Sequence, residues 1–125
     1  FAYLRGPKRF DRIKPDGSKY TYTEGSIGEY EDINKPSRTI LTSEGWLIRC
    51  THFLKINNRY RTFTPIETER LQYFPDNWTK YKIHNDEIKE VSDRMRLFFM
   101  GNALVTDIVK HIGLGIKDIV EKYGE

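Results

Sequence analysis

The spacing of apolar residues near the C-terminal end restricts the fold of this chain more than any other feature. From Asn102 onward, apolar side chains recur at steps of three and four, at Leu104, Val105, Ile108, Val109, Ile112, Ile116, Ile119 and Val120. This spacing is typical of an α-helix that buries one face. We therefore expect a long C-terminal amphipathic helix. Gly113 and Gly115 weaken it locally, and they either permit close packing or break the helix.

A second, shorter helix is predicted by its start signals. Thr64 can act as an N-cap, Pro65 follows at the first helical position, and Glu67 stands three residues after the cap. This is the pattern of a capping box, in which side chains satisfy the free backbone donors of a helix start. The helix should end by about Tyr73, because Pro75 disfavours helical backbone at the residue before it.

A third helix is predicted in the second half of the chain. Ser92 can cap a helix that runs from Asp93 to about Met100 and ends near the following glycine. The chain is then expected to have two parts. Residues 1–60 form one part of loops and short strands, and residues 61–125 carry the capped helix, a linker and the C-terminal helix.

The first part lacks helical periodicity and is punctuated by glycine and proline. Runs of β-forming residues predict short strands at 19–23, 38–42 and 46–53, with a turn at 43–45 between the last two. The expected fold class is therefore α+β, with a small irregular β region ahead of the helices.

Charge and cysteine content restrict the function classes. The net charge is +3 with a pI of about 9.0, and basic residues crowd the start of the chain, at Arg5, Lys8, Arg9, Arg12 and Lys14. A phosphate-contacting face and an ordinary solvated surface are both compatible with this distribution. The single cysteine excludes an intrachain disulfide and favours a reducing compartment. We see no apolar stretch of the length that a membrane span needs, and no signal peptide. The chain begins with Phe1, which suggests a processed product or a piece of a longer protein.

Chemistry that would make the chain an enzyme by itself is missing from the sequence. His52, His84 and His111 are isolated and lack the spacing of metal ligands. Cys50 lies in an expected strand and reads as an inert cysteine. A glycine-rich phosphate loop is also absent. We therefore predict no catalytic residue and no metal site.

A segment in the middle of the chain nevertheless matches a family signature. The run 61–76, R-T-F-T-P-I-E-T-E-R-L-Q-Y-F-P-D, resembles the ninth motif of DNA (cytosine-5) methyltransferases, R-x-L-T-x-x-E-x-x-R-L-Q-G-F-P-D. The matching residues are Arg61, Thr64, Glu67, Arg70, Leu71, Gln72, Phe74, Pro75 and Asp76. Phe63 stands where leucine is usual and keeps an apolar anchor. Tyr73 stands where glycine is usual, in the turn after the helix.

Two further segments agree with this resemblance in order and spacing. Gly101 to Val105, G-N-A-L-V, resembles the tenth motif of the family, which opens the final helix. Residues 35–45, K-P-S-R-T-I-L-T-S-E-G, resemble a K-P-S-x-T-I run in the target-recognition regions of bacterial members. The resemblance covers roughly residues 20 to 120.

Other family motifs are missing. The family nucleophile lies in a Pro-Cys pair, whereas Cys50 follows Arg49. The glycine-rich motif for S-adenosylmethionine and the Glu-Asn-Val and Gln-x-Arg-x-Arg motifs are also absent, and in ordinary members these precede the recognition region. The resemblance thus implies the DNA-reading, C-terminal part of a bacterial restriction-modification methyltransferase, inactive alone. Its implied partners are double-stranded DNA and an N-terminal catalytic domain or subunit in the cytoplasm. That domain would bind most of the cofactor, S-adenosylmethionine.

The resemblance also implies site residues. The loop 43–46, and a second one at 24–29, fall where recognition loops are expected, with candidate DNA contacts at Arg38, Ser43, Glu44 and Arg49. Either arginine could donate to guanine, and the glutamate could accept from a cytosine amine. A surface charge or a phosphate contact remains open for each. Asn102 and Ala103 would border the S-adenosylmethionine pocket, and a plain cap of the final helix is the alternative for Asn102.

The ninth motif reads as structural. Arg61, Glu67 and Arg70 are spaced to tie the helix to the recognition strands, and Leu71 and Phe74 to pack beneath them. The first basic residues of the chain could contact phosphates. Three interpretations remain open: a fragment or split subunit of a methyltransferase, a non-catalytic sequence-specific DNA-binding module, and a degenerate remnant.

Overall fold

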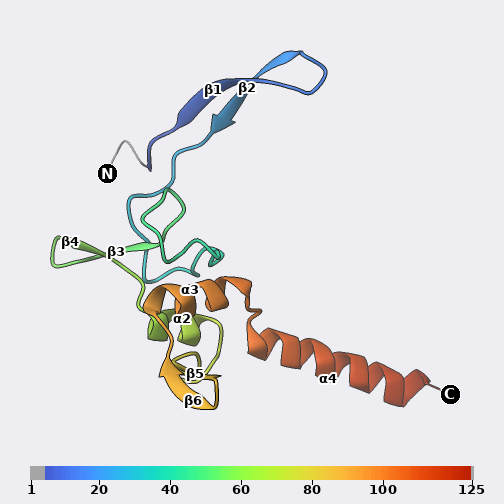
Figure 1. Ribbon diagram of the computed structural model, residues 1–125. Helices are drawn as coiled ribbons and strands as arrows, with labels where there is room; N and C mark the ends of the chain where they lie inside the picture. The colour runs from blue at the N-terminus through green and yellow to red at the C-terminus, as the bar shows by residue number, and fades with distance from the viewer. Residues whose placement is uncertain (1–4, 125) are drawn as a thin grey trace.

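The computed structural model describes residues 5–124 (Figure 1). Two antiparallel hairpins come first, a third lies between the first two of three helices, and each hairpin is a separate two-stranded sheet. In chain order the elements are β1 (Lys8–Ile13), β2 (Lys19–Glu24), β3 (Phe53–Ile56), β4 (Arg59–Thr62), α2 (Pro65–Leu71), β5 (Tyr81–His84), β6 (Glu87–Glu90), α3 (Asp93–Asn102) and α4 (Thr106–Tyr123). The predicted α+β fold class is confirmed.

The hairpins form where short polar turns allow the backbone to reverse. Asn57 and Asn58 between β3 and β4 have φ values of 48° and 60°, and Asn85 and Asp86 between β5 and β6 have 54° and 60°. Two successive residues with positive φ form the turn that matches the twist of a hairpin, and Asn and Asp tolerate this region. Gly17, at φ 84°, serves the wider β1–β2 turn.

The strand predictions were only partly correct. The expected strand at 19–23 is β2, although its partner β1 was not predicted. The expected strands at 38–42 and 46–53 are wrong: residues 36–41 have no regular secondary structure, and the chain turns repeatedly between 42 and 50. Side chains replace the missing ladder here, since Thr51 Oγ1 accepts from Ile48 N at 3.0 Å and donates to the carbonyl of Trp46.

Helix α2 begins as its sequence predicts. Thr64 Oγ1 accepts from Glu67 N at 3.3 Å, and the Glu67 carboxylate accepts from Thr64 N at 2.8 Å. The helix ends at Leu71, and Tyr73 then adopts a φ of 60°. The family motif has glycine at this left-handed position, which costs a tyrosine about 1–2 kcal/mol.

The prediction of a final helix beginning at Asn102 is wrong. Asn102 is the last residue of α3, residues 103–105 are extended, and α4 begins at Thr106. Helix α4 then continues without a break through both of its glycines.

The core is small and centred on α2 and α3. Its buried apolar side chains are Ile40, Phe53, Leu54, Val91, Leu97 and Met100. A buried polar brace joins the two helices: Arg96 NH2 donates to Glu69 Oε1 at 3.0 Å, and Thr79 N donates to the same oxygen at 3.0 Å. Burial raises the pKa of Glu69, but hydrogen bonds from Thr79 and Arg96 outweigh it and hold the pKa below its usual value. The residue therefore stays ionised inside the fold.

Candidate functional site at the junction of three sequence motifs

The three motif-like segments meet around one cavity of about 380 Å³. Residues 37–40 of the K-P-S run line it, together with residues 71–72 at the end of α2 and residues 103–105 between α3 and α4. Segments separated by more than thirty positions in the sequence thus form one site.

Gln72 is the side chain that joins two of these segments. Its Nε2 donates to Met100 O at 2.9 Å, and the side chain is buried. In return, Thr106 N donates to Gln72 O at 3.1 Å, and Thr106 Oγ1 donates to Tyr73 O at 2.9 Å. The glutamine and the threonine therefore fix the start of α4 against the end of α2.

Gly101 lies where α3 meets residues 41–42 of the K-P-S run. A Cβ atom at this position would lie 2.3 Å from Leu41 C and 2.3 Å from Thr42 N. Atoms of the main chain occupy that space, so only glycine lets α3 approach the K-P-S run this closely. Close approach, and not backbone conformation, explains this glycine.

Asn102 follows directly and is exposed. The expectation that it caps the final helix is wrong, because the N-cap of α4 is Val105 and no side chain caps it. Instead, Asn102 Nδ2 donates to Phe98 O at 3.1 Å, within α3. Ala103 is half-buried and lines the cavity.

The ninth-motif residues act as braces, in part as predicted. Arg61 in β4 donates to both Glu67 oxygens at 2.7 and 2.6 Å, which ties α2 to the β3–β4 hairpin. These hydrogen bonds, with those from Thr64, lower the pKa of Glu67 to about 2. Arg70 does not reach the strands; it donates to Asp76 at 2.8 and 2.6 Å and closes the turn after α2.

The two apolar residues of this motif pack less deeply than predicted. Leu71 remains 38% exposed and lines cavities instead of filling the core. Phe74 is half-buried and tilts against Trp78, with ring centroids 6.3 Å apart.

Glu44 in the expected recognition loop is an interior residue. Its side chain is 1% exposed, and its two oxygens accept from His52 N at 2.8 Å and contact His52 Nδ1 at 2.8 Å. The His52 ring also stacks on Phe63. This arrangement contradicts a base-reading role for Glu44, because its carboxylate is buried and already engaged.

The two candidate arginines are also engaged within the chain. Arg38 donates to Glu31 Oε1 from Nε at 3.0 Å and from NH2 at 2.6 Å, with its side chain 37% exposed. Arg49 donates to Gly6 O at 2.6 Å and pairs with Glu24 at 3.1 Å, with its side chain 12% exposed. Arg38 is thus the more accessible of the two.

Arg5 does not fit the expectation of a phosphate contact. It is 2% exposed, its NH1 donates to Arg49 O at 2.5 Å, and its guanidinium lies 5.0 Å from the Phe53 ring centroid. Burial, followed by repulsion from neighbouring arginines, lowers the pKa of Arg5.

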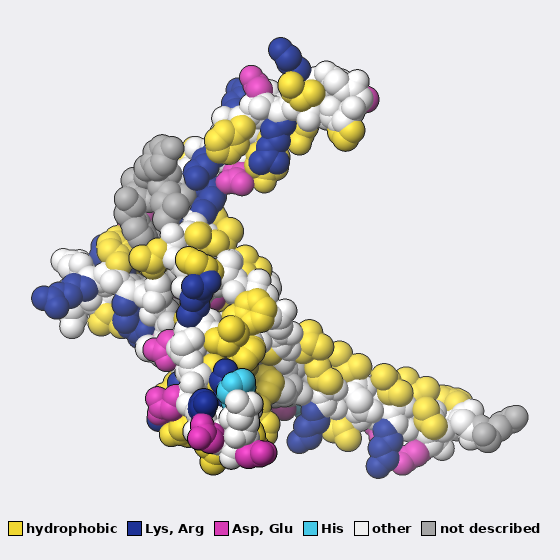
Figure 2. All heavy atoms as spheres, viewed as in Figure 1, with side chains coloured by type: hydrophobic (Ala, Val, Ile, Leu, Met, Phe, Trp, Pro, Cys, Tyr) yellow, Lys and Arg dark blue, Asp and Glu magenta, His cyan; other side chains and the backbone are white. Residues whose placement is uncertain are grey.

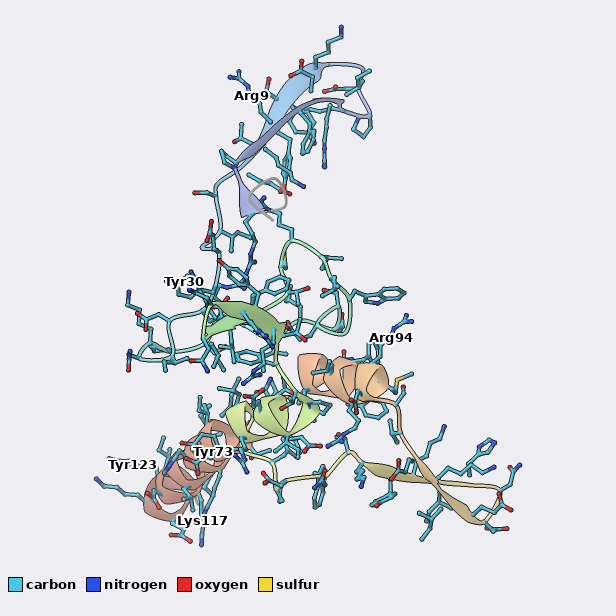
Figure 3. The ribbon with its side chains drawn as sticks, turned by 90° about the vertical axis from the view of Figure 1, so that its left-hand side faces the viewer. Arg9, Tyr30, Tyr73, Arg94, Lys117 and Tyr123 are labelled. Atoms are coloured by element: carbon cyan, nitrogen blue, oxygen red, sulfur yellow. The ribbon has the colours of Figure 1, made fainter. Side chains whose placement is uncertain are left out.

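The exposed part of the expected recognition loop and of the residue after it is apolar, which the sequence did not predict. Ser43 is half-buried at its start, whereas Trp46 and Leu47 are 52% and 75% exposed. Arg94 of α3, labelled in Figure 3, lies 3.5 Å from the centroid of the Trp46 ring in a cation–π contact. The accessible tip of the loop is therefore a clamped tryptophan followed by a leucine.

The family assignment agrees with this junction. Residues 8–118 match the family model of the C-5 cytosine-specific DNA methylases. The chain belongs to this family. It is 46% identical over 119 residues to the Type II methyltransferase M.Sau3AI of Staphylococcus aureus, an alignment that covers 95% of this chain and 27% of that protein. The chain thus spans about a quarter of the relative's length. No solved structure matches it significantly.

Helix α4 leaves this methylase chain with an uncovered apolar face. Among the described helices and strands α4 contacts no other element, and it projects from the body (Figure 1). Ile108, Ile112 and Ile119 are 57%, 58% and 60% exposed. Figure 2 shows apolar side chains along one edge of α4 and charged side chains along the opposite edge. Such a helix is stable when another surface covers its apolar face.

The same region has the length and apolar composition of a membrane span, contrary to the expectation from the sequence. The stretch Asp93–Tyr123 is long and apolar enough by that measure. It is, however, two helices separated by an extended link, and α4 carries Lys110, Lys117 and Lys122 on its polar face. The pattern is that of an amphipathic surface helix and not of a helix that is apolar on all sides.

The two remaining histidines are exposed. Within residues 5–124, no group of three or more histidine, cysteine or acidic side chains is placed to hold a metal ion. His84 is exposed in β5, and His111 lies 3.5 Å from Asp107 on the polar side of α4.

Proposed function

We propose that this chain is the DNA-reading, C-terminal part of a DNA (cytosine-5) methyltransferase of a restriction-modification system in the bacterial cytoplasm. Its partners are double-stranded DNA and an N-terminal catalytic domain or subunit. The observation that carries the proposal is the cavity where the K-P-S run, the end of the ninth motif and the G-N-A turn meet. Each segment is held by contacts that its motif residues make, so the motifs act together in this chain.

Catalysis is assigned to the other part of the enzyme. The sole cysteine, Cys50, follows Arg49 rather than a proline and lies half-buried in a turn. A target cytosine must leave the duplex before a nucleophile can reach it. This chain would hold the DNA while that step occurs elsewhere, and it transfers no methyl group alone.

Asn102 and Ala103 are proposed to form one edge of the cofactor pocket. Asn102 is exposed, and its amide nitrogen donates to Phe98 O, while its side-chain oxygen has no hydrogen-bond partner among residues 5–124. The amine and adenine N–H groups of S-adenosylmethionine are donors that suit such an oxygen. When bound, the cofactor supplies the methyl group. The chain offers only this edge, which fits a cofactor held mainly by the catalytic domain.

The proposed DNA contacts are those candidate residues whose side chains remain accessible. Arg38 and Ser43 border the recognition loop and remain partly accessible. Arg49 is largely enclosed and is proposed to position the loop beside any DNA contact. Glu44 is left out because its carboxylate is bound to His52.

The apolar face of α4 is proposed to dock on the catalytic part. The relative is nearly four times as long as the aligned region, so most of its surface lies outside this chain. Covering Ile108, Ile112 and Ile119 would remove apolar area from water at roughly 25 cal/mol per Å². Docking would therefore stabilise the helix.

A mixing experiment tests the proposal. The chain, the N-terminal portion of the M.Sau3AI-type relative, and both together are incubated with duplex DNA and radiolabelled S-adenosylmethionine. We expect 5-methylcytosine only in the mixture. Transfer by the chain alone refutes the assignment of catalysis, and no transfer with tight DNA binding favours a non-catalytic DNA-binding module.

A substitution tests the cofactor edge. Asn102→Ala should weaken S-adenosylmethionine binding by the mixture, because it removes the open acceptor. Asn34→Ala is the matched control, since Asn34 is equally exposed and its amide donates only locally, to Asp32. Equal affinities for the two variants would rule out the role of Asn102.

A further inference from the structure

The β1–β2 hairpin stands apart from the rest of the molecule. Among the described helices and strands, β1 and β2 contact only each other, and the hairpin extends away from the body (Figure 1). An isolated two-stranded ribbon is marginally stable in water. A ribbon that is retained without packing on the core is suited to contact something outside the chain.

One face of the ribbon stabilises it internally. Arg12 lies 4.2 Å from the centroid of the Tyr22 ring. Phe10 stands directly opposite Tyr22 in the strand register, and Arg12 stands opposite Tyr20. Opposed pairs of this kind contribute roughly 0.2–1 kcal/mol each. This aromatic face keeps the ribbon formed.

The acidic groups of the ribbon are engaged within the chain. Asp11 Oδ1 accepts from Thr21 Oγ1 at 2.9 Å. Asp16 accepts from the backbone and the hydroxyl of the residue two positions later, at 2.9 and 2.7 Å. Glu24 pairs with Arg49 at 3.1 Å. These carboxylates are therefore poor competitors for the cations of the ribbon.

Three basic side chains of the ribbon have no acidic partner among the described residues. Across residues 5–124, the side chains of Arg9, Lys14 and Lys19 form no ion pair. Arg9 is opposite Thr23, and Lys19 of β2 is opposite Ile13 of β1. Because Arg9 and Ile13 are four residues apart along β1, Arg9 and Lys19 project from the same face of the ribbon. At about 3.4 Å per residue they are separated by roughly 14 Å. Figure 3 shows Arg9 projecting outward from the ribbon.

The β5–β6 hairpin provides a contrast in the same molecule. It is equally exposed, and Lys82 stands opposite Lys89. Lys89 pairs with Glu87 at 3.1 Å. Residues 81–90 carry two basic and three acidic side chains, whereas residues 8–24 carry five basic and three acidic ones. Of these two hairpins, only β1–β2 carries more basic than acidic side chains.

We propose that the β1–β2 ribbon is an arm that grips the phosphate backbone of duplex DNA beside the target site. The inference rests on the proposed function, which supplies DNA as the partner, and it adds a contact outside the motif junction. Phosphates of one strand recur about every 3.4 Å of helix axis. Arg9 and Lys19 therefore span phosphates roughly four nucleotides apart. Contacts of this kind orient the enzyme and do not read sequence.

The salt dependence of DNA binding tests the arm. Fluorescence anisotropy of a labelled duplex is measured with the full chain between about 50 and 200 mM KCl, where phosphate contacts have a large effect. Arg9→Gln with Lys19→Gln should reduce the slope of log affinity against log salt by about 2, since each lost contact releases about 0.9 fewer counterions. Lys82→Gln with Lys89→Gln removes the same charge and should keep the wild-type slope.

A charge-conserving variant guards against misfolding. Arg9→Lys with Lys19→Arg should restore the slope. An unchanged slope in the glutamine variant overturns the arm, as does an equal reduction in the β5–β6 control. The methyl-transfer experiment tests the proposed function separately. If the glutamine variant of the ribbon lowers the slope but the mixture forms no 5-methylcytosine, the DNA-gripping arm stands and the proposed function is refuted. If the mixture forms 5-methylcytosine but the slope is unchanged, the proposed function stands and the arm is refuted.

Discussion

Substituting Gly101 by alanine sets two physical effects against each other. Gly101 lies near the end of α3, where alanine is favoured over glycine by about 1 kcal/mol on helix propensity alone. The new Cβ would, however, lie 2.3 Å from Leu41 C. Ordinary carbon contacts are about 3.5 Å, so the two backbones must separate by roughly 1 Å. Overpacking costs typically about 1–3 kcal/mol. Because main-chain atoms must move, we expect a cost near the upper end of this range, which leaves a net loss of about 2 kcal/mol.

Urea unfolding followed by circular dichroism and tryptophan fluorescence measures this loss. Trp46 reports on the junction, because Arg94 of α3 lies over its ring. Gly113→Ala is the helix-matched control: a Cβ there meets nothing within 4 Å, so it should raise helix content without lowering the unfolding midpoint. If Gly101→Ala unfolds at the same or a higher urea concentration than the wild type, the close approach of α3 to the K-P-S run does not exist in solution.

Three other expectations follow from single contacts. Tyr73→Gly should raise the free energy of unfolding by about 1 kcal/mol in urea titrations, because it relieves a φ of 60° at a side chain that is 64% exposed; a loss of stability would refute the strain. The pKa of Glu67 is lowered to about 2 from 4.5, so its contribution is present above about pH 4.5 and is lost as the pH falls toward 2. Glu67→Gln should flatten that part of the stability profile, and parallel wild-type and variant profiles would contradict the assignment. Ile112→Asp should weaken binding of the catalytic part at least tenfold by calorimetry, while Lys117→Asp on the polar face leaves it nearly unchanged; equal effects would exclude the apolar face as the docking surface.

Local signals in the sequence predicted the helices better than the strands. The capping box at Thr64 and Glu67 and the cap at Ser92 each act through side chains three positions from their targets, so sequence alone contains the whole interaction. The turns at Asn57 and Asn85 are local signals as well, although the hairpins that they form were not predicted. The strands expected at 38–42 and 46–53 failed for a different reason. A strand needs a partner, and β-forming composition says nothing about whether one exists.

The same difference between local and long-range interactions applies to the candidate site. Sequence motifs indicated which segments matter, but Glu44, Arg49 and Gln72 turned out to act as internal joints whose partners are eight or more residues away. A charged residue in a recognition loop can read a base only if its polar atoms remain free, and burial of Glu44 against His52 removes that freedom. The exposure of α4 shows the converse: its periodicity correctly predicted an apolar face, yet periodicity cannot say which surface covers it. Both outcomes point to one rule for this chain. Residues that a motif makes prominent hold the junction together, and the surfaces left open, at the β1–β2 ribbon, the Trp46 loop and α4, are where we propose that partners bind.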